Sequence, residues 1–210
     1  MAQTIAFGGL CLLLCSRTLP AADDLIVPNL RVGPITRTST ESQLLKIFGK
    51  LAVKQPIELG EGETEPGLVI YPDDPTRRLA ITWNDQKQPS IIFLCYQSPD
   101  PPCRWHTSTG ITLGTTLKDL ERLNRRPFEM VVWGSDVGGN VVDYRGGALD
   151  RQFGLTLVPR IDKDGGYLPH LTDGEFASVQ GERFVLSTDP VLQKLNPYVA
   201  VMHLTFPSAK

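Results

Sequence analysis

The residues that could do chemistry in this chain are few and lie far apart. Its three histidines are His106, His170 and His203, and residues 23–210 contain no G-x-S-x-G, H-E-x-x-H, Walker or G-x-G-x-x-G motif. Those motifs would supply an activated serine, a pair of zinc ligands or a phosphate cradle. The sequence therefore favours a non-enzymatic function, and it predicts no metal site and no cofactor.

A second group of residues is suited to binding. Trp133, Asp136 and Arg145 surround the glycine turn of a predicted hairpin, and Trp105 and His106 precede it. An aromatic ring at a strand end, both charge signs and a turn that admits close approach are typical of a binding surface. We predict that these five residues bind a partner; the alternative is an ordinary tight hairpin with a half-buried tryptophan.

Strand alternation separates two of the tryptophans. Trp83 shares its face with Leu79 and Ile81, which predicts a core residue, whereas Trp133 shares its face with Glu129 and therefore has the better prospect of exposure. Exposed tryptophan rings can stack on sugars, so a carbohydrate-binding module that uses Trp105 and Trp133 is an alternative function.

Cys95 and Cys103 bracket a proline-rich loop, YQSPDPP. An even pair of cysteines in an exported chain predicts a disulfide, while two free thiols are the alternative if export fails. A metal site is disfavoured because only His106 is near and there is no second Cys-x-x-Cys.

Two further polar motifs have structural interpretations. The run from Asp162 to Gly166 begins like a calcium loop but lacks the later carboxylates, so we expect a hairpin turn. His203 lies on a strand with apolar residues on both faces and is expected to be a core residue. A secreted hydrolase would instead need His106 or His170 beside an aspartate that only the fold brings near.

Residues 1–22 have the shape of a signal peptide, with the apolar run IAFGGLCLLLC followed by small residues before Asp23 and Asp24. A buried N-terminal helix is the alternative, although Gly8 and Gly9 disfavour it. We expect a periplasmic or secreted protein with no membrane span after the leader. The formal net charge of −2 gives no basic excess, so we expect no nucleic-acid partner.

The order of the elements that would position these residues predicts an α+β fold of two helix-plus-antiparallel-meander units in tandem. The 19 glycines and 17 prolines favour turns and short strands over a helical bundle. The first helix starts with a Thr38 to Glu41 capping box and ends at Gly49. Strands are expected at residues 68–71, 78–83 and 90–96.

The second unit starts with a helix over residues 114–124, capped by Thr115 or Thr116. Strands are expected at 128–133 and 140–145 and through LTLVP. Leu44, Leu45, Ile47 and Phe48, together with Leu117, Leu120 and Leu123, should pack the two helices onto the sheet. A C-terminal strand, helix and strand complete it, with Asp189 capping the helix and residues 199–206 inside the sheet. The predicted divisions are residues 1–22, 23–106, 107–160 and 161–210.

The stretches ITRTSTESQLLKIFG and ITLGTTLKDLERLN resemble the threonine-capped, leucine-rich helix of β-lactamase-inhibitor-like modules and of outer-membrane lipoprotein modules of the BamE type. The resemblance covers about residues 32–160. It implies a protein-binding or scaffold role through an exposed sheet face, and it carries over no functional residue. RPFEMVVWGSDVGGNVVDYRGGAL is also similar to segments of bacterial secreted proteins without an assigned activity.

Together these observations predict an exported, non-enzymatic binding or scaffold protein of the cell envelope, whose partner is another protein or an envelope component. The secreted hydrolase and the carbohydrate-binding module stay open as alternatives.

Overall fold

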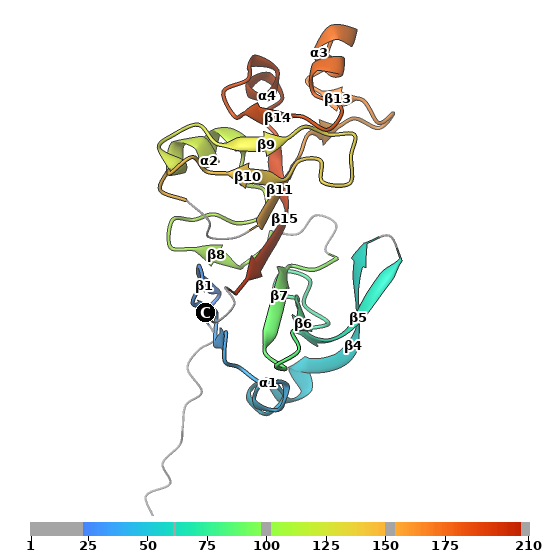
Figure 1. Ribbon diagram of the computed structural model, residues 1–210. Coiled ribbons are helices and arrows are strands. Elements are labelled where there is room, and N and C mark those ends of the chain that lie inside the picture. The colour runs from blue at the N-terminus through green and yellow to red at the C-terminus, as the bar shows by residue number, and fades with distance from the viewer. Residues whose placement is uncertain (1–22, 61, 98–101, 150–153, 207–210) are drawn as a thin grey trace, which may run out of the picture.

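The computed structural model describes residues 23–60, 62–97, 102–149 and 154–206 (Figure 1). Strands account for 38% of the described residues and helices for 18%, so the fold is mostly β and the predicted α+β class is wrong. The predicted leader, residues 1–22, lies outside the described residues. Within the described part of the chain, no helix is long and apolar enough to cross a membrane.

The largest sheet has six antiparallel strands. Their order across the sheet is β11 (Gly154–Val158), β15 (Tyr198–Thr205), β7 (Pro89–Leu94), β6 (Leu79–Trp83), β5 (Glu63–Ile70) and β4 (Ala52–Gly60). The predicted meander is confirmed in β5, β6 and β7, which pair in chain order. The sequence did not indicate β4, because most of its side chains are exposed and the alternation that marks a half-buried strand is missing.

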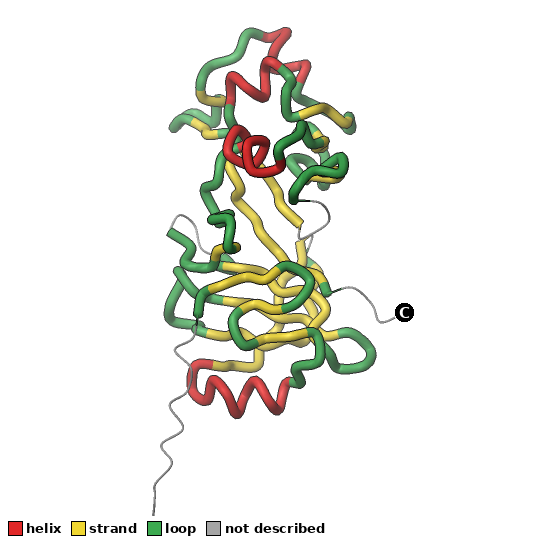
Figure 2. The backbone as a smooth tube through the Cα atoms, turned by 90° about the vertical axis from the view of Figure 1, so that its left-hand side faces the viewer, coloured by secondary structure: helices red, strands yellow, loops and turns green. Residues whose placement is uncertain are grey.

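β15 connects the two ends of the molecule. It lies between β11 and β7, as expected for a strand with apolar residues on both faces. In Figure 1 it runs from the upper part, which holds β9, β10 and β14, down to the lower part, which holds β4 to β7. Figure 2 shows the connection between the two parts from the side, with the strands in yellow. The predicted domain boundaries stay a prediction.

The second helix-meander unit does not form. β9 (Glu129–Val131) and β10 (Val141–Asp143) pair as a hairpin, but the third sheet partner is β14 (Phe184–Leu186), in the order β10, β9, β14. The next strand along the chain, β11, pairs with β15 instead. A helix followed by short strands therefore does not fix which strands pair, because long-range packing decides it.

Two small sheets complete the strands. One has the order β3 (Ile35–Thr36), β2 (Arg31–Val32), β1 (Leu25–Val27) and β8 (His106–Thr107), with β1 parallel to β8. The other pairs β12 (Arg160–Ile161) with β13 (Tyr167–Leu168).

The helices are short. They are α1 (Glu41–Phe48), which continues into a 3-10 turn over Gly49–Leu51, α2 (Leu117–Asn124), α3 (Asp173–Ser178) and α4 (Pro190–Leu195). The capping box of α1 is formed by Thr40 and Gln43, so its predicted start at Thr38 is wrong by two residues. Thr116 caps α2, and Asp189 caps α4 as expected.

The main core lies on one face of the six-stranded sheet and continues beneath α2 and α4. Leu44 and Phe48 of α1 are buried in it, but Ile47 is exposed, so the predicted apolar stripe of α1 is narrower than expected. A second, small cluster forms on the opposite face, where Ile57 of the curled β4–β5 hairpin covers Val69 and Ala80.

Candidate functional site

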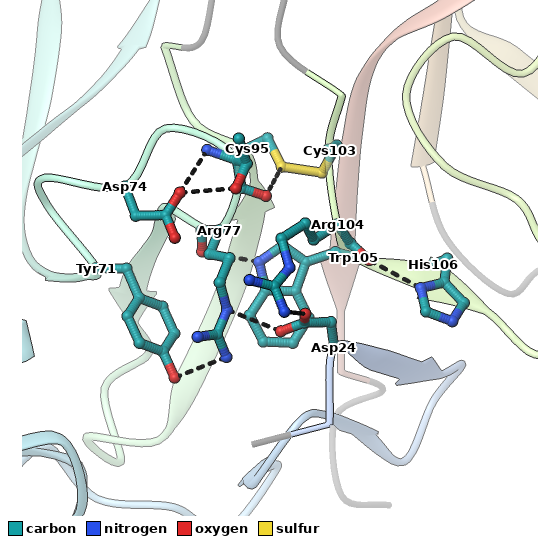
Figure 3. Close-up of polar contacts among 10 residues, drawn as sticks. Asp24, Tyr71, Asp74, Arg77, Cys95, Cys103, Arg104, Trp105 and His106 are labelled. Carbon is teal, nitrogen blue, oxygen red and sulfur yellow. Dashed lines mark hydrogen bonds and ion pairs between the residues drawn. A yellow bond between two sulfur atoms is a disulfide. The ribbon is translucent and has the colours of Figure 1, made fainter. Parts of the chain in front are cut away.

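The predicted disulfide is confirmed. Cys95 and Cys103 are bonded with their Cα atoms 5.8 Å apart, and both are buried. The bond joins the end of β7 to the segment that enters β8 (Figure 3). It therefore positions Trp105 and His106, two of the predicted binding residues.

Trp105 belongs to the core. Its side chain is fully buried, and its indole Nε1 donates to the carbonyl oxygen of Arg77 at 2.8 Å. His106 is exposed beside it, with Nδ1 2.8 Å from the carbonyl oxygen of Arg104. The pair can therefore offer a partner the imidazole but not the indole.

An ion-pair network surrounds Trp105 (Figure 3). Asp24 accepts from Arg77 Nε at 2.8 Å and pairs with Arg104 at 2.7 Å, while its side chain is only 9% exposed. The Arg77 guanidinium also lies 4.1 Å from the centre of the Tyr71 ring, and burial raises the pKa of Tyr71. These groups satisfy one another, so the network fastens the N-terminal segment to the body of the protein.

The expected exposure of Trp133 is wrong. The side chain is buried, Nε1 donates to the carbonyl oxygen of Leu157 at 2.9 Å, and the ring meets that of Tyr167 edge-on. A Cβ atom at Gly139 would lie 2.1 Å from the same Leu157 oxygen, so the turn needs glycine there. The β9–β10 hairpin thus uses its tryptophan to attach to β11 and β13.

Asp136 and Arg145 are exposed at opposite ends of this hairpin. Neither forms an ion pair with another described residue, and the backbone N–H of Arg145 donates to Asp143 Oδ1 at 2.7 Å. No hydrogen bond or ring contact within the described ranges links them to Trp105 or to His106, which begins β8 of the four-stranded sheet. The predicted binding role of Asp136, Arg145 and His106 stays a prediction.

Other polar arrangements are local. Asp162 accepts the amides of Asp164 and Gly166 at 2.8 and 2.9 Å, which lowers the pKa of its carboxyl and confirms the predicted hairpin turn. His170, which follows β13, has its Nδ1 3.8 Å from Asp162 Oδ2, but its side chain is 75% exposed. The described ranges hold no cluster of three or more potential metal ligands.

A hollow of about 470 Å³ lies at the tip of the β4–β5 hairpin. Its main polar groups already bind one another: the Tyr96 hydroxyl accepts from the Glu58 amide at 2.8 Å, and Gln97 Nε2 donates to the Glu58 carboxylate at 2.9 Å. These hydrogen bonds therefore hold the hairpin against the disulfide-bonded segment.

The most unusual surface is the face of the three-stranded sheet that points away from the core. Met130, Val141 and Val185 pair across the strands and pack toward the core. Alternation then places the side chains of the outer face on the other side. This outer face is formed by Glu129, Val131, Val142, Asp143, Phe184 and Leu186, and Val131, opposite Phe184, is the one of them that is buried.

Three large apolar side chains of the outer face are open to solvent. Phe184 is 67% exposed, Val142 47% and Leu186 38%. The register places Leu186 opposite Glu129, and Glu129 opposite Asp143. A β-bulge between Val141 and Asp143 accommodates the extra residue, Val142, on β10.

The edge strand β4 provides a contrast within the same protein. Its outward positions include Lys54, Pro56 and Glu58, residue types that discourage pairing with another chain. The short edge strand β14 instead presents Phe184 and Leu186. Val53 and Leu59 of β4 are also 41% and 36% exposed, but charged residues and a proline lie between them, whereas β14 contains neither.

The sequence contained one signal for this face. Residues 182–187, ERFVLS, read as a strand, and Phe184 and Leu186 alternate in it. Alternation alone does not tell which face is buried, because that depends on which other elements join the core beside Met130 and Val185.

Comparisons with protein-family models, with curated proteins and with solved structures find no match to this chain.

Proposed function

We propose that this chain is an exported binding protein that docks another protein of the cell envelope on its outer face. The observation that carries the proposal is the exposure of Phe184, Val142 and Leu186 on one face of one small sheet. Apolar side chains gathered on a sheet face mark interaction surfaces more often than isolated ones do. Docking removes their surface from water, which favours association.

The disulfide supports export. Cys95 and Cys103 are paired, and structural disulfides persist in oxidising compartments outside the cytoplasm. The apolar leader before Asp23 agrees with this assignment.

The two alternatives receive less support. A sugar platform built on Trp105 and Trp133 needs exposed rings, and both indoles are buried and hydrogen-bonded to backbone carbonyls. The pair of His170 and Asp162 lacks the enclosure that a hydrolytic site uses to exclude water, because the His170 side chain is 75% exposed.

Capture from an extracytoplasmic extract tests the proposal. The protein, a Phe184→Ser/Leu186→Ser variant and a Leu30→Ser/Leu51→Ser control would each be immobilised. The control positions are 66% and 50% exposed but lie in other elements. We expect a partner that the protein and the control retain, and that the outer-face variant retains about tenfold less.

Circular dichroism would establish that all three proteins are folded. Equal capture by the outer-face variant and the control, with both folded, would overturn the proposal.

A further inference from the structure

We infer that the partner places a lysine or arginine side chain between Glu129 and Asp143, with apolar side chains on both sides of it. This inference rests on the proposed use of the outer face for docking and adds the chemistry of the segment that docks there.

The two acidic residues are cross-strand neighbours beside the β-bulge, and Asp143 Oδ1 also accepts the Arg145 amide. Glu129 and Asp143 are cross-strand partners on β9 and β10, and both belong to the outer face. The Cβ atoms of such partners are about 5 Å apart, and like charges at this spacing destabilise a sheet. The sheet thus keeps a repulsive pair beside its exposed apolar side chains.

No base in the described part of the protein offsets this pair. Neither Glu129 nor Asp143 forms an ion pair with a described residue, whereas other surface acids, such as Glu41 and Asp119, do. Arg145 reaches Asp143 only through its backbone amide. The Arg183 guanidinium donates to the carbonyl oxygen of Ser178 instead.

A cationic side chain from a partner would interact with both carboxylates and relieve their repulsion. The stem of a lysine or arginine is apolar and would lie against Leu186 and Val142, which flank the pair. An extended segment presents alternate residues on one face about 7 Å apart. The same spacing separates Phe184 from Leu186 along β14. Apolar residues two positions before and after the base would therefore lie on the same face as the base and would meet the exposed apolar side chains.

Three peptide probes test this chemistry. They are blocked peptides of about nine residues whose odd positions alternate Val with Lys, Gln or Glu and whose even positions are all Ser, so that the apolar and the variable side chains lie on one face of an extended segment. Fluorescence anisotropy would measure their binding to the full chain. We expect the Val-Lys peptide to bind about three to ten times tighter than the Val-Gln peptide, and the Val-Glu peptide to bind weakest. About 0.5 M salt should remove the preference.

Matched variants locate the preference. Glu129→Gln/Asp143→Asn should bind the Val-Lys and Val-Gln peptides equally. Glu63→Gln/Glu65→Gln, which removes two exposed carboxylates from β5, should keep the preference.

The outcomes separate this inference from the proposed function. If Phe184→Ser/Leu186→Ser abolishes binding but the protein does not prefer Lys over Gln, the outer face binds and the inference fails. If no peptide binds, or if binding does not depend on Phe184 and Leu186, both fail. Self-association in sedimentation velocity that strengthens in Glu129→Gln/Asp143→Asn would identify a second copy as the occupant and overturn the inference.

Discussion

Asp24 holds the N-terminal segment in place through a carboxylate that is almost withdrawn from water. It lies between Arg77 and Arg104, and Arg77 is itself largely buried. A buried charge that loses its partner is costly, because the protein interior solvates it poorly. The adjacent Asp23 pairs with Arg31 at the surface, where water screens the interaction.

These two neighbours therefore form a matched test. Asp24→Asn should lower the free energy of unfolding by about 3 kcal/mol. Asp23→Asn should lower it by about 0.5 kcal/mol. Urea denaturation at neutral pH would measure both, and equal effects would contradict the network described for Asp24.

His203 should make stability depend on pH. Its ring lies against Phe93 with centroids 6.0 Å apart and above Gly154, and burial lowers its pKa. The unfolded chain binds this proton near the ordinary pKa of about 6.5, and the folded chain binds it only at lower pH. The contribution of His203 to stability is therefore complete above about pH 6.5 and is lost as the pH falls below that value.

Denaturation of the protein and of His203→Gln at about pH 7.5 and 5.5 would measure this contribution. The protein should lose more stability over this interval than the variant does. An equal loss would show that protonation of His203 does not matter for folding.

Single residues differ in how far sequence reveals them. The disulfide of Cys95 and Cys103 and the turn at Asp162 were predictable because their partners lie within ten residues along the chain. The burial of Trp133 was not, since it depends on Leu157 and Tyr167, which belong to other elements. The exposure of Phe184 was not predictable for the same reason.

At the scale of elements, α1 shows which residues of a predicted apolar stripe are buried. Leu44 and Phe48 face the core, whereas Ile47 faces solvent. Phe48→Ala should lower the free energy of unfolding by about 3 kcal/mol, because it leaves a cavity in the core. Ile47→Ala should change it by less than about 0.5 kcal/mol. Thermal or urea denaturation would compare them, and similar losses would place Ile47 in the core.

The strands show which of them the hydrophobic pattern of the sequence predicts and which it does not. β15 was predictable because residues 199–206 carry apolar side chains on both faces. β4 was not predictable, because Ile57 is its one buried residue and lies beneath the curl of its own hairpin. The pairing of β9 with β14 joins residues more than fifty positions apart, and no local signal specifies such a contact.

At the scale of the whole molecule, β15 joins two parts with different surfaces. The part with β4 protects its edge with Lys54, Pro56 and Glu58, and the part with β14 exposes Phe184 and Leu186. In Figure 1 the exposed β14 lies at the end opposite α1. The arrangement leaves the outer face accessible to a large partner while the disulfide and the Asp24 network secure the other end.

Site-specific photo-crosslinking would show whether a partner contacts the outer face. A benzophenone amino acid would replace Phe184 in one protein and Leu30 in another, two positions that are 67% and 66% exposed. After illumination of cells that produce and export the protein, the account predicts a discrete protein adduct from position 184 and none from position 30. The absence of an adduct at 184, or the same adducts from both positions, would contradict the claim that the outer face binds a partner.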